Sequence, residues 1–146
     1  MNDLITYILF FLILVIVLSA IFTKLTSRKI KRSIPKFGKT TVLQDAEIHW
    51  YESGQGKPII MLHGLAGNLR NFTYALVGKL DQDYRVIAID RAGCGWSTRS
   101  KSECATLQEQ ARIISEFIDK EQIEKPLIVG HSLGGAIALA LALEYK

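Results

Sequence analysis

Cysteine is scarce in this chain of 146 residues, which contains only Cys94 and Cys104. The two lie ten residues apart, belong to no Cys-x-x-Cys pair and have no histidine cluster beside them. These absences exclude the zinc and thioredoxin-like redox sites that such spacings support. We expect two free thiols, no metal and no cofactor.

Acidic residues are absent from residues 24–39, although this segment holds seven of the 18 basic residues. From residue 45 onward the chain has eleven basic and thirteen acidic residues, so a basic segment adjoins a mildly acidic domain. A nucleic-acid binder would instead carry its basic residues across the folded face. We therefore expect no nucleic-acid partner.

Charged residues are also absent from residues 4–23, which are almost wholly apolar. A helix of about twenty residues spans roughly 30 Å, the thickness of a bilayer's hydrocarbon core. We predict a transmembrane anchor over residues 1–23 and a basic juxtamembrane linker over residues 24–40. The alternative is an exported protein with an uncleaved or cleaved signal segment. A cleaved signal is disfavoured because no Lys or Arg precedes the long apolar run.

The basic residues lie on the C-terminal side of the apolar run. The positive-inside rule then predicts a single-pass protein whose following domain is cytoplasmic, at a bacterial inner membrane or its equivalent. The same basic residues could contact anionic lipid headgroups.

Residues 41–146 are predicted to form an α/β domain. Short apolar runs typical of strands buried on both faces occur at residues 58–62, 85–90 and 126–130. Residues 41–52 predict a strand or hairpin with a Gly-rich turn at 53–56. Helices are predicted over residues 68–80, from Thr106-x-x-Glu109 onward, and over residues 133–145. This alternation predicts a mainly parallel sheet with helices on both faces.

The third of these strands leads into Gly130-His131-Ser132-Leu133-Gly134-Gly135, just before the last helix. A serine on a sharp strand-to-helix turn is a candidate nucleophile, and its flanking glycines remove side chains that would collide there. The helix N-terminus behind Ser132 favours a developing negative charge.

Two further motifs follow the other two buried strands. His63-Gly64-Leu65-Ala66-Gly67 follows the first, and its glycines would let the backbone approach a substrate. Asp90-Arg91-Ala92-Gly93-Cys94-Gly95-Trp96-Ser97 follows the second. Parallel sheets bind ligands at the carboxyl ends of their strands, so we expect all three motifs at one site.

With these motifs, residues 41–146 resemble the N-terminal half of the α/β-hydrolase family, in particular its membrane-anchored, monoacylglycerol-lipase-like serine esterases and lipases. The resemblance implies that Ser132 is the nucleophile and that the N–H groups of Leu65 and Leu133 form the oxyanion hole. His63, Gly64, Gly67, Asp90, Gly93, Gly95, Gly130, His131, Gly134 and Gly135 would support these motifs. A serine nucleophile argues against the dehalogenases and epoxide hydrolases of the family, which use Asp there.

Members of this family complete a triad with an acid and then a histidine after the nucleophile. No histidine follows Ser132 here, because His49, His63 and His131 all precede it. We therefore expect the chain to be a fragment, which the coding DNA beyond Lys146 would test.

The resemblance implies hydrolysis of carboxylic esters, most simply lipid-type acyl esters, through an acyl-enzyme on Ser132. The expected partners are a small-molecule ester and the membrane. The alternatives are a catalytically inactive membrane-tethered binding domain, or a thioesterase, acyltransferase or C–C hydrolase of the same family.

Overall fold

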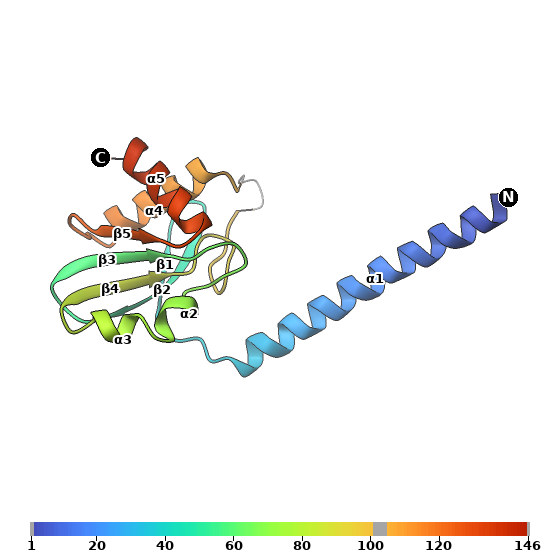
Figure 1. Ribbon diagram of the computed structural model, residues 1–146, viewed down its shortest axis with the longest axis horizontal. Coiled ribbons are helices and arrows are strands. Elements are labelled where there is room, and N and C mark those ends of the chain that lie inside the picture. The colour runs from blue at the N-terminus through green and yellow to red at the C-terminus, as the bar shows by residue number, and fades with distance from the viewer. Residues whose placement is uncertain (1, 101–104, 146) are drawn as a thin grey trace. The chain divides into compact units, whose positions relative to one another are not determined.

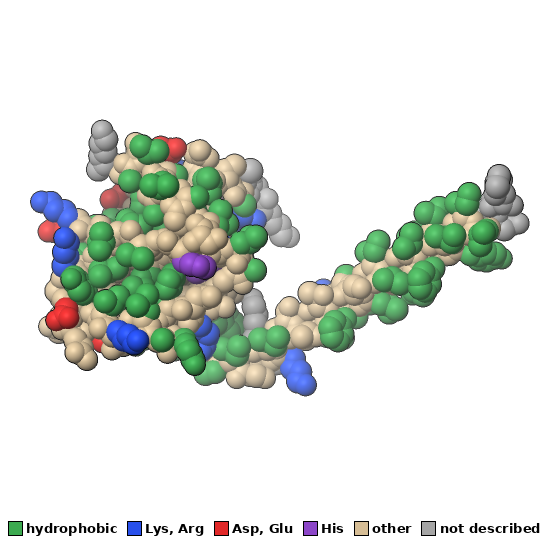
Figure 2. All heavy atoms as spheres, in the orientation of Figure 1, with side chains coloured by type: hydrophobic (Ala, Val, Ile, Leu, Met, Phe, Trp, Pro, Cys, Tyr) green, Lys and Arg blue, Asp and Glu red, His purple; other side chains and the backbone are tan. Residues whose placement is uncertain are grey.

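The computed structural model describes residues 2–100 and 105–145, which form two compact units, residues 1–36 and 37–146. The first unit is dominated by the helix α1, Asn2–Ser33. Its segment Leu4–Ile30 has a mean hydropathy of 3.0 and is long and apolar enough to cross a membrane. Hydrophobic side chains are exposed along its length (Figure 2).

The helix α1 continues ten residues beyond the predicted end of the anchor at residue 23. Residues 24–33 are therefore helical rather than an irregular linker. Lys and Arg are good helix formers, and no Pro or Gly interrupts the chain before Pro35. The boundary between the two units falls between Lys36 and Phe37.

The second unit is built on a mixed five-stranded sheet with the order β1-β2-β4-β3-β5 (Figure 1). The predicted parallel part is present, since β3 pairs in parallel with both β4 and β5. The strands β1 and β2 add an antiparallel edge, with β2 paired to β4. The strand bounds are β1 Lys39–Val42, β2 Glu47–Ser53, β3 Lys57–Leu62, β4 Tyr84–Ile89 and β5 Leu127–Gly130.

The hairpin predicted within residues 41–56 has its turn elsewhere. The chain reverses between β1 and β2, where Leu43 N–H donates to the Ala46 carbonyl at 2.7 Å. The Gly-rich residues 53–56 instead connect β2 to β3, and β4 lies between these two strands in the sheet. Gly54 and Gly56 have positive φ in this connection, a conformation that glycine adopts without strain.

The helix predicted over residues 68–80 is two short helices, α2 Arg70–Thr73 and α3 Val77–Leu80. Each helix has only four residues, and residues 74–76 between them form turns. Phe72 and Val77 are buried, whereas Leu76 next to Val77 is 39% exposed.

The helices cover both faces of the sheet, as predicted (Figure 1). The larger core lies under α4, Leu107–Lys120, and α5, Leu133–Glu144, and the smaller one lies under α2 and α3. The predicted cap of α4 is present, since Thr106 Oγ1 accepts a hydrogen bond from Glu109 N–H at 3.2 Å. Burying these apolar faces on a central sheet fixes where each strand ends.

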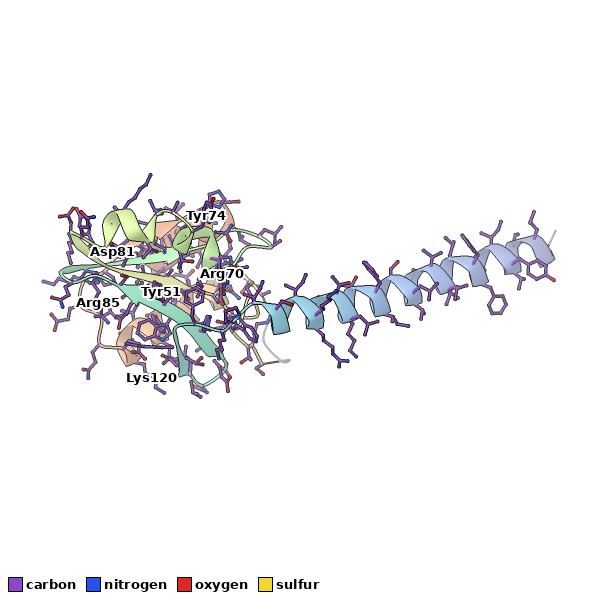
Figure 3. The ribbon with its side chains drawn as sticks, turned by 90° about the horizontal axis from the view of Figure 1, so that it is seen from below. Tyr51, Arg70, Tyr74, Asp81, Arg85 and Lys120 are labelled. Atoms are coloured by element: carbon purple, nitrogen blue, oxygen red, sulfur yellow. The ribbon has the colours of Figure 1, made fainter. Side chains whose placement is uncertain are left out.

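The N-terminal end of the second unit is packed rather than loose. The Phe37 ring lies 5.2 Å from the Tyr51 ring, and the Arg70 guanidinium lies 4.5 Å from the Phe37 centroid. Tyr51 and Arg70 come from β2 and α2 (Figure 3). Phe37 therefore ties the start of the unit to two of its elements.

Within the described residues, β5 is an edge strand that pairs only with β3. Leu127 at its start is 50% exposed, unlike the fully buried side chains of β4. The three parallel strands nevertheless end side by side, because Leu62 pairs with both Ile89 and Gly130. The loops that follow them meet at this end of the sheet.

Candidate active site

Ser132 occupies a sharp turn between β5 and α5. Its backbone angles are φ 54° and ψ −120°, a combination that residues with a side chain rarely adopt. Such strain persists only where the surrounding structure imposes it, and it is common at active sites. The Ser132 side chain is exposed at this turn.

Close backbone packing explains the glycines that flank this turn. A Cβ on Gly130 would overlap the Gly134 carbonyl, and a Cβ on Gly134 would overlap the Leu62 carbonyl at the end of β3. Gly135 is less constrained, since its nearest neighbour would lie at 3.4 Å. The turn thus needs glycine at the first two positions.

The loop of residues 63–67 lies directly against Ser132. A Cβ on Gly64 would be 3.1 Å from the Ser132 Cβ, and the His131 N–H donates to the Leu62 carbonyl at 2.9 Å. In the part of the chain that the structure describes, the N–H groups of Leu65 and Leu133 donate to no protein group. Both N–H groups are therefore available to a ligand.

His63 is a buried, neutral residue of this loop. Its Nε2 accepts the Arg91 N–H at 3.1 Å, so Nδ1 carries the proton that is donated to the Gly64 carbonyl at 2.9 Å. Burial lowers the pKa of His63, and the nearby Arg91 charge acts in the same direction. The tautomer is fixed by these two contacts, so His63 holds the loop and has no free nitrogen for proton transfer.

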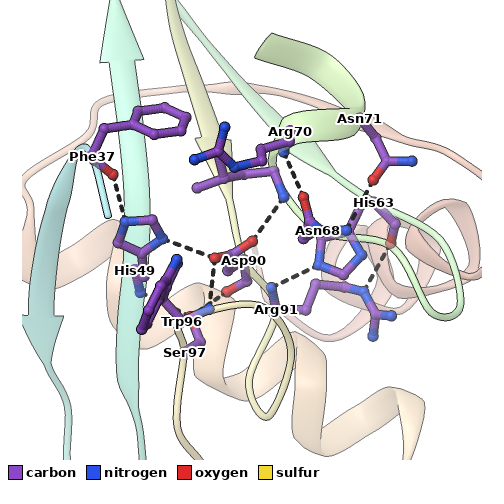
Figure 4. A network of polar contacts seen from close by, with 11 residues as sticks. Phe37, His49, His63, Asn68, Arg70, Asn71, Asp90, Arg91, Trp96 and Ser97 are labelled. Atoms are coloured by element: carbon purple, nitrogen blue, oxygen red, sulfur yellow. Dashed lines mark hydrogen bonds and ion pairs between the residues drawn. The ribbon is translucent and has the colours of Figure 1, made fainter. Parts of the chain in front are cut away.

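Asp90 connects the loop that follows β4 to the strand β2 and to the residue that precedes α2 (Figure 4). Its carboxylate accepts hydrogen bonds from the Leu69 N–H at 2.7 Å, the Trp96 N–H at 2.9 Å and the His49 ring at 2.8 Å. The Ser97 hydroxyl donates to the Asp90 carbonyl at 2.6 Å and accepts the His49 N–H at 2.8 Å. Asp90 therefore has a structural role here, as its position after a strand indicates.

The loop after β4 requires glycine at two positions. Gly93 and Gly95 have φ of +79° and +54°, and a Cβ on Gly95 would overlap the Asp90 carboxylate. The short path around Asp90 is thus open only to a residue without a side chain. Cys94, between these glycines, is a free cysteine, whereas Cys104 lies outside the described residues.

Sequence reasoning missed the part played by His49. Its Nδ1 faces Asp90 and its Nε2 lies 2.6 Å from the Phe37 carbonyl, so both nitrogens face acceptors. The only sequence signal is a histidine within a predicted strand, which does not reveal its partner across the sheet.

A general base for Ser132 is not found among the described residues. His49 and His63 are buried and engaged by the contacts given above, and no hydrogen bond joins His131 or a carboxylate to the Ser132 hydroxyl in residues 2–100 and 105–145. Across these same residues, no group of three or more His, Cys, Asp or Glu side chains is placed to hold a metal ion. Within the described residues, the arrangement thus offers an exposed serine and two N–H groups but no proton acceptor for that serine.

Comparison with known proteins agrees with this geometry. Residues 57–146 match the family model described as the alpha/beta hydrolase fold. The chain is 38% identical over 120 residues to 2-hydroxy-6-oxo-6-phenylhexa-2,4-dienoate hydrolase of Comamonas testosteroni, covering 75% of this chain and 40% of that protein. It is 34% identical over 98 residues to haloalkane dehalogenase 2 of Mycobacterium bovis, covering 66% of this chain and 34% of that protein.

A solved structure shows the same fold. The crystal structure of a putative lipase from Acinetobacter baumannii AYE superposes with a TM-score of 0.69 at 31% identity, covering 75% of this chain and 37% of that one. The chain thus spans about 40% or less of the length of these relatives. The family model, the shared fold and the strand-to-helix turn at Ser132 agree: this chain belongs to the α/β-hydrolase fold family.

Proposed function

We propose that Ser132 is the nucleophile of a serine hydrolase that cleaves carboxylic esters, with lipid-type acyl esters as the substrate class. The observation that carries this proposal is the strained, exposed position of Ser132 beside two unpaired N–H groups, those of Leu65 and Leu133. A serine nucleophile with two N–H donors near it is the arrangement that stabilises the oxyanion of an acyl-transfer intermediate.

The proposed reaction has two steps. Ser132 Oγ attacks the ester carbonyl carbon, the C–O bond to the alcohol breaks, and the alcohol leaves with a proton. Water then attacks the acyl-enzyme, releases the carboxylic acid and restores the Ser132 hydroxyl. The Leu65 and Leu133 N–H groups stabilise the negative oxygen in both steps.

The proton from Ser132 must pass to a general base, because a serine hydroxyl is a weak nucleophile at neutral pH. The chain spans about 40% or less of its relatives, and His49 and His63 are engaged elsewhere. We propose that the base and its acid belong to the remainder of a longer protein, of which these residues form the nucleophile part.

The membrane helix supports the choice of lipid-type esters. The segment Leu4–Ile30 is able to cross a bilayer and would keep the site close to lipid-derived molecules. We propose that α1 is an uncleaved single-pass anchor and that residues 37–146 face the cytoplasm, because the basic residues follow the apolar run.

The test is ester hydrolysis by the membrane-embedded protein at its natural length. We expect cleavage of p-nitrophenyl esters, faster for long acyl chains than for acetate, and a loss of at least about 1,000-fold in kcat/KM for Ser132→Ala. The matched control is Ser115→Ala on α4, a half-buried serine outside the site. Hydrolysis that survives Ser132→Ala would contradict the proposal.

A second candidate is carbon–carbon bond hydrolysis, favoured by the 38% identity to 2-hydroxy-6-oxo-6-phenylhexa-2,4-dienoate hydrolase. The same nucleophile and oxyanion donors would serve a ketone as well as an ester. A vinylogous keto acid and a p-nitrophenyl ester offered separately distinguish the two. Cleavage of the keto acid with no ester hydrolysis would replace the first candidate by the second.

A further inference from the structure

The peptide group between Gly64 and Leu65 is held on its oxygen side by three donors. The Gly64 carbonyl accepts His63 Nδ1–H at 2.9 Å, Arg91 Nη2–H at 3.0 Å and Gly67 N–H at 3.3 Å. A carbonyl oxygen has two lone pairs, so it is fully engaged by these contacts. These three contacts on the oxygen therefore fix the orientation of the Gly64–Leu65 peptide group.

The nitrogen side of this peptide group is free. A peptide group is planar and trans, so fixing the Gly64 oxygen in one direction fixes the Leu65 N–H in the opposite direction. No hydrogen bond in the described part of the chain uses that N–H. Gly64 itself lies beside Ser132, with the 3.1 Å approach noted above.

Arg91 does more than add one of these donors. Its side chain is 4% exposed, and its Nε–H also donates to the His63 carbonyl at 2.8 Å. One planar guanidinium thus bridges the carbonyls of His63 and Gly64, a geometry that the single ammonium of lysine does not reproduce. Figure 4 shows the contact with His63. The Arg91 N–H also fixes the His63 ring, so Arg91 controls both side-chain donors.

The charge of Arg91 has a further consequence. Hydrogen bonds from an ionised donor are about twice as strong as neutral ones, and hydrogen bonds through a peptide group strengthen one another. A positive charge on the Gly64 oxygen side draws electron density from the peptide nitrogen. The Leu65 N–H therefore becomes a stronger donor toward a developing oxyanion.

We propose that Arg91 is a positioning residue that holds and polarises the Gly64–Leu65 peptide, with His63 as its neutral partner. Arg91 does not touch substrate in this account; it acts through Leu65. The inference rests on the proposed function, because the benefit appears only when an oxyanion forms above Ser132. Arg91 is then a buried cation behind the proposed oxyanion hole, whose two donors are the Leu65 and Leu133 N–H groups.

The test compares wild type, Arg91→Met and Arg91→Lys in the membrane-embedded protein at its natural length. We expect Arg91→Met to lower kcat by about 10- to 100-fold while KM changes less than about 2-fold, because only the transition state carries the full oxyanion charge. Inhibition by an acyl trifluoromethyl ketone, which forms an oxyanion on serine, should weaken by the same factor as kcat/KM. Arg91→Lys should recover part of the loss.

The control is Arg112→Met, which removes an arginine that pairs with Asp45, Glu109 and Glu116 away from the site. It should leave kcat and trifluoromethyl ketone inhibition within about 2-fold of wild type. An Arg91→Met enzyme with unchanged kcat and inhibition would overturn the inference while leaving the proposed function intact.

A measurement that does not depend on activity distinguishes a failure of the Arg91 inference from a failure of the proposed function. Amide hydrogen exchange over residues 62–69 should accelerate at least about 10-fold in Arg91→Met, while exchange within α5 remains as in wild type. Wild-type protein that hydrolyses no ester would overturn the proposed function. Unchanged exchange over residues 62–69 would overturn the inference whatever the activity of the wild type.

Discussion

His49 Nδ1 lies 2.8 Å from Asp90 Oδ2, and each side chain is 1% exposed. His49 belongs to β2 and Asp90 follows β4, so the contact joins two strands that also pair along their backbones. The second nitrogen of His49 faces the Phe37 carbonyl. This buried contact links the start of the second unit to the loop that supports the oxyanion motif.

Asp90→Asn should destabilise the fold. The asparagine side chain has one oxygen where Asp90 uses two to accept three hydrogen bonds. Its N–H₂ group would face some of these donors, and the buried His49 ring would have a poor partner. A buried N–H donor left without its acceptor costs about 1–3 kcal/mol of unfolding free energy. Urea denaturation of the full chain in detergent, followed by Trp fluorescence, measures this. Asp83→Asn, an exposed acid before β4, is the control and should change stability by less than about 0.5 kcal/mol.

The tight turn around Ser132 is tested by two neighbouring glycines. Gly134→Ala should cost about 2–3 kcal/mol or more, because its Cβ would overlap the Leu62 carbonyl, a backbone atom of a central strand. Gly135→Ala is the matched control in the same helical turn, where the nearest atom would lie at 3.4 Å. It should change stability by less than about 1 kcal/mol. Equal losses for the two variants would contradict the packing described here.

The neutral state of His63 predicts a pH dependence. Burial lowers the pKa of folded His63, so between that pKa and the unfolded value of about 6.5 the unfolded chain binds more protons. The contribution of His63 to the free energy of unfolding is therefore fully present above about pH 6.5. This contribution is lost as the pH falls toward the pKa of folded His63. His63→Asn, which retains a donor toward Gly64, should lack this part of the slope between pH 7 and 5. Parallel pH profiles for wild type and variant would show that His63 does not titrate in this way.

Membrane topology is testable with single cysteines. In a Cys94→Ser, Cys104→Ser background, Asn2→Cys should react with a membrane-impermeant maleimide in intact cells, since we place the N-terminus outside. Gln55→Cys, in the exposed β2–β3 loop, should react only after permeabilisation. The opposite pattern would mean an exported domain, and loss of α1 from the mature protein would identify a cleaved signal segment.

Sequence alone was sufficient for the strands that carry the site. The apolar runs of β3 and β4 are buried in the middle of the sheet, and the run of β5 has the same apolar composition although β5 lies at the edge of the described sheet. Ser132 and its glycines were also predictable, because a strand-to-helix turn imposes a local requirement on a few adjacent residues.

Features that depend on distant partners were not predictable. The division of residues 68–80 into α2 and α3 depends on how the segment packs on the sheet, which outweighs weak helix propensities. The pairing of His49 with Asp90 depends on the β2–β4 register, and the contacts of Arg91 depend on where β3 and β4 end. The extension of α1 to Ser33 is not predictable from the apolar run, because the residues that continue the helix beyond residue 23 are largely charged and polar.

The central claim is that Ser132 is a reactive nucleophile, and active-site labelling tests it most directly. Membranes containing the protein at its natural length are treated with a fluorophosphonate probe, and the modified residue is located by peptide mass spectrometry. We predict one adduct, on Ser132, that is lost in Ser132→Ala and retained in Ser115→Ala. An unlabelled wild type, or an adduct that persists on another residue in Ser132→Ala, would contradict the account.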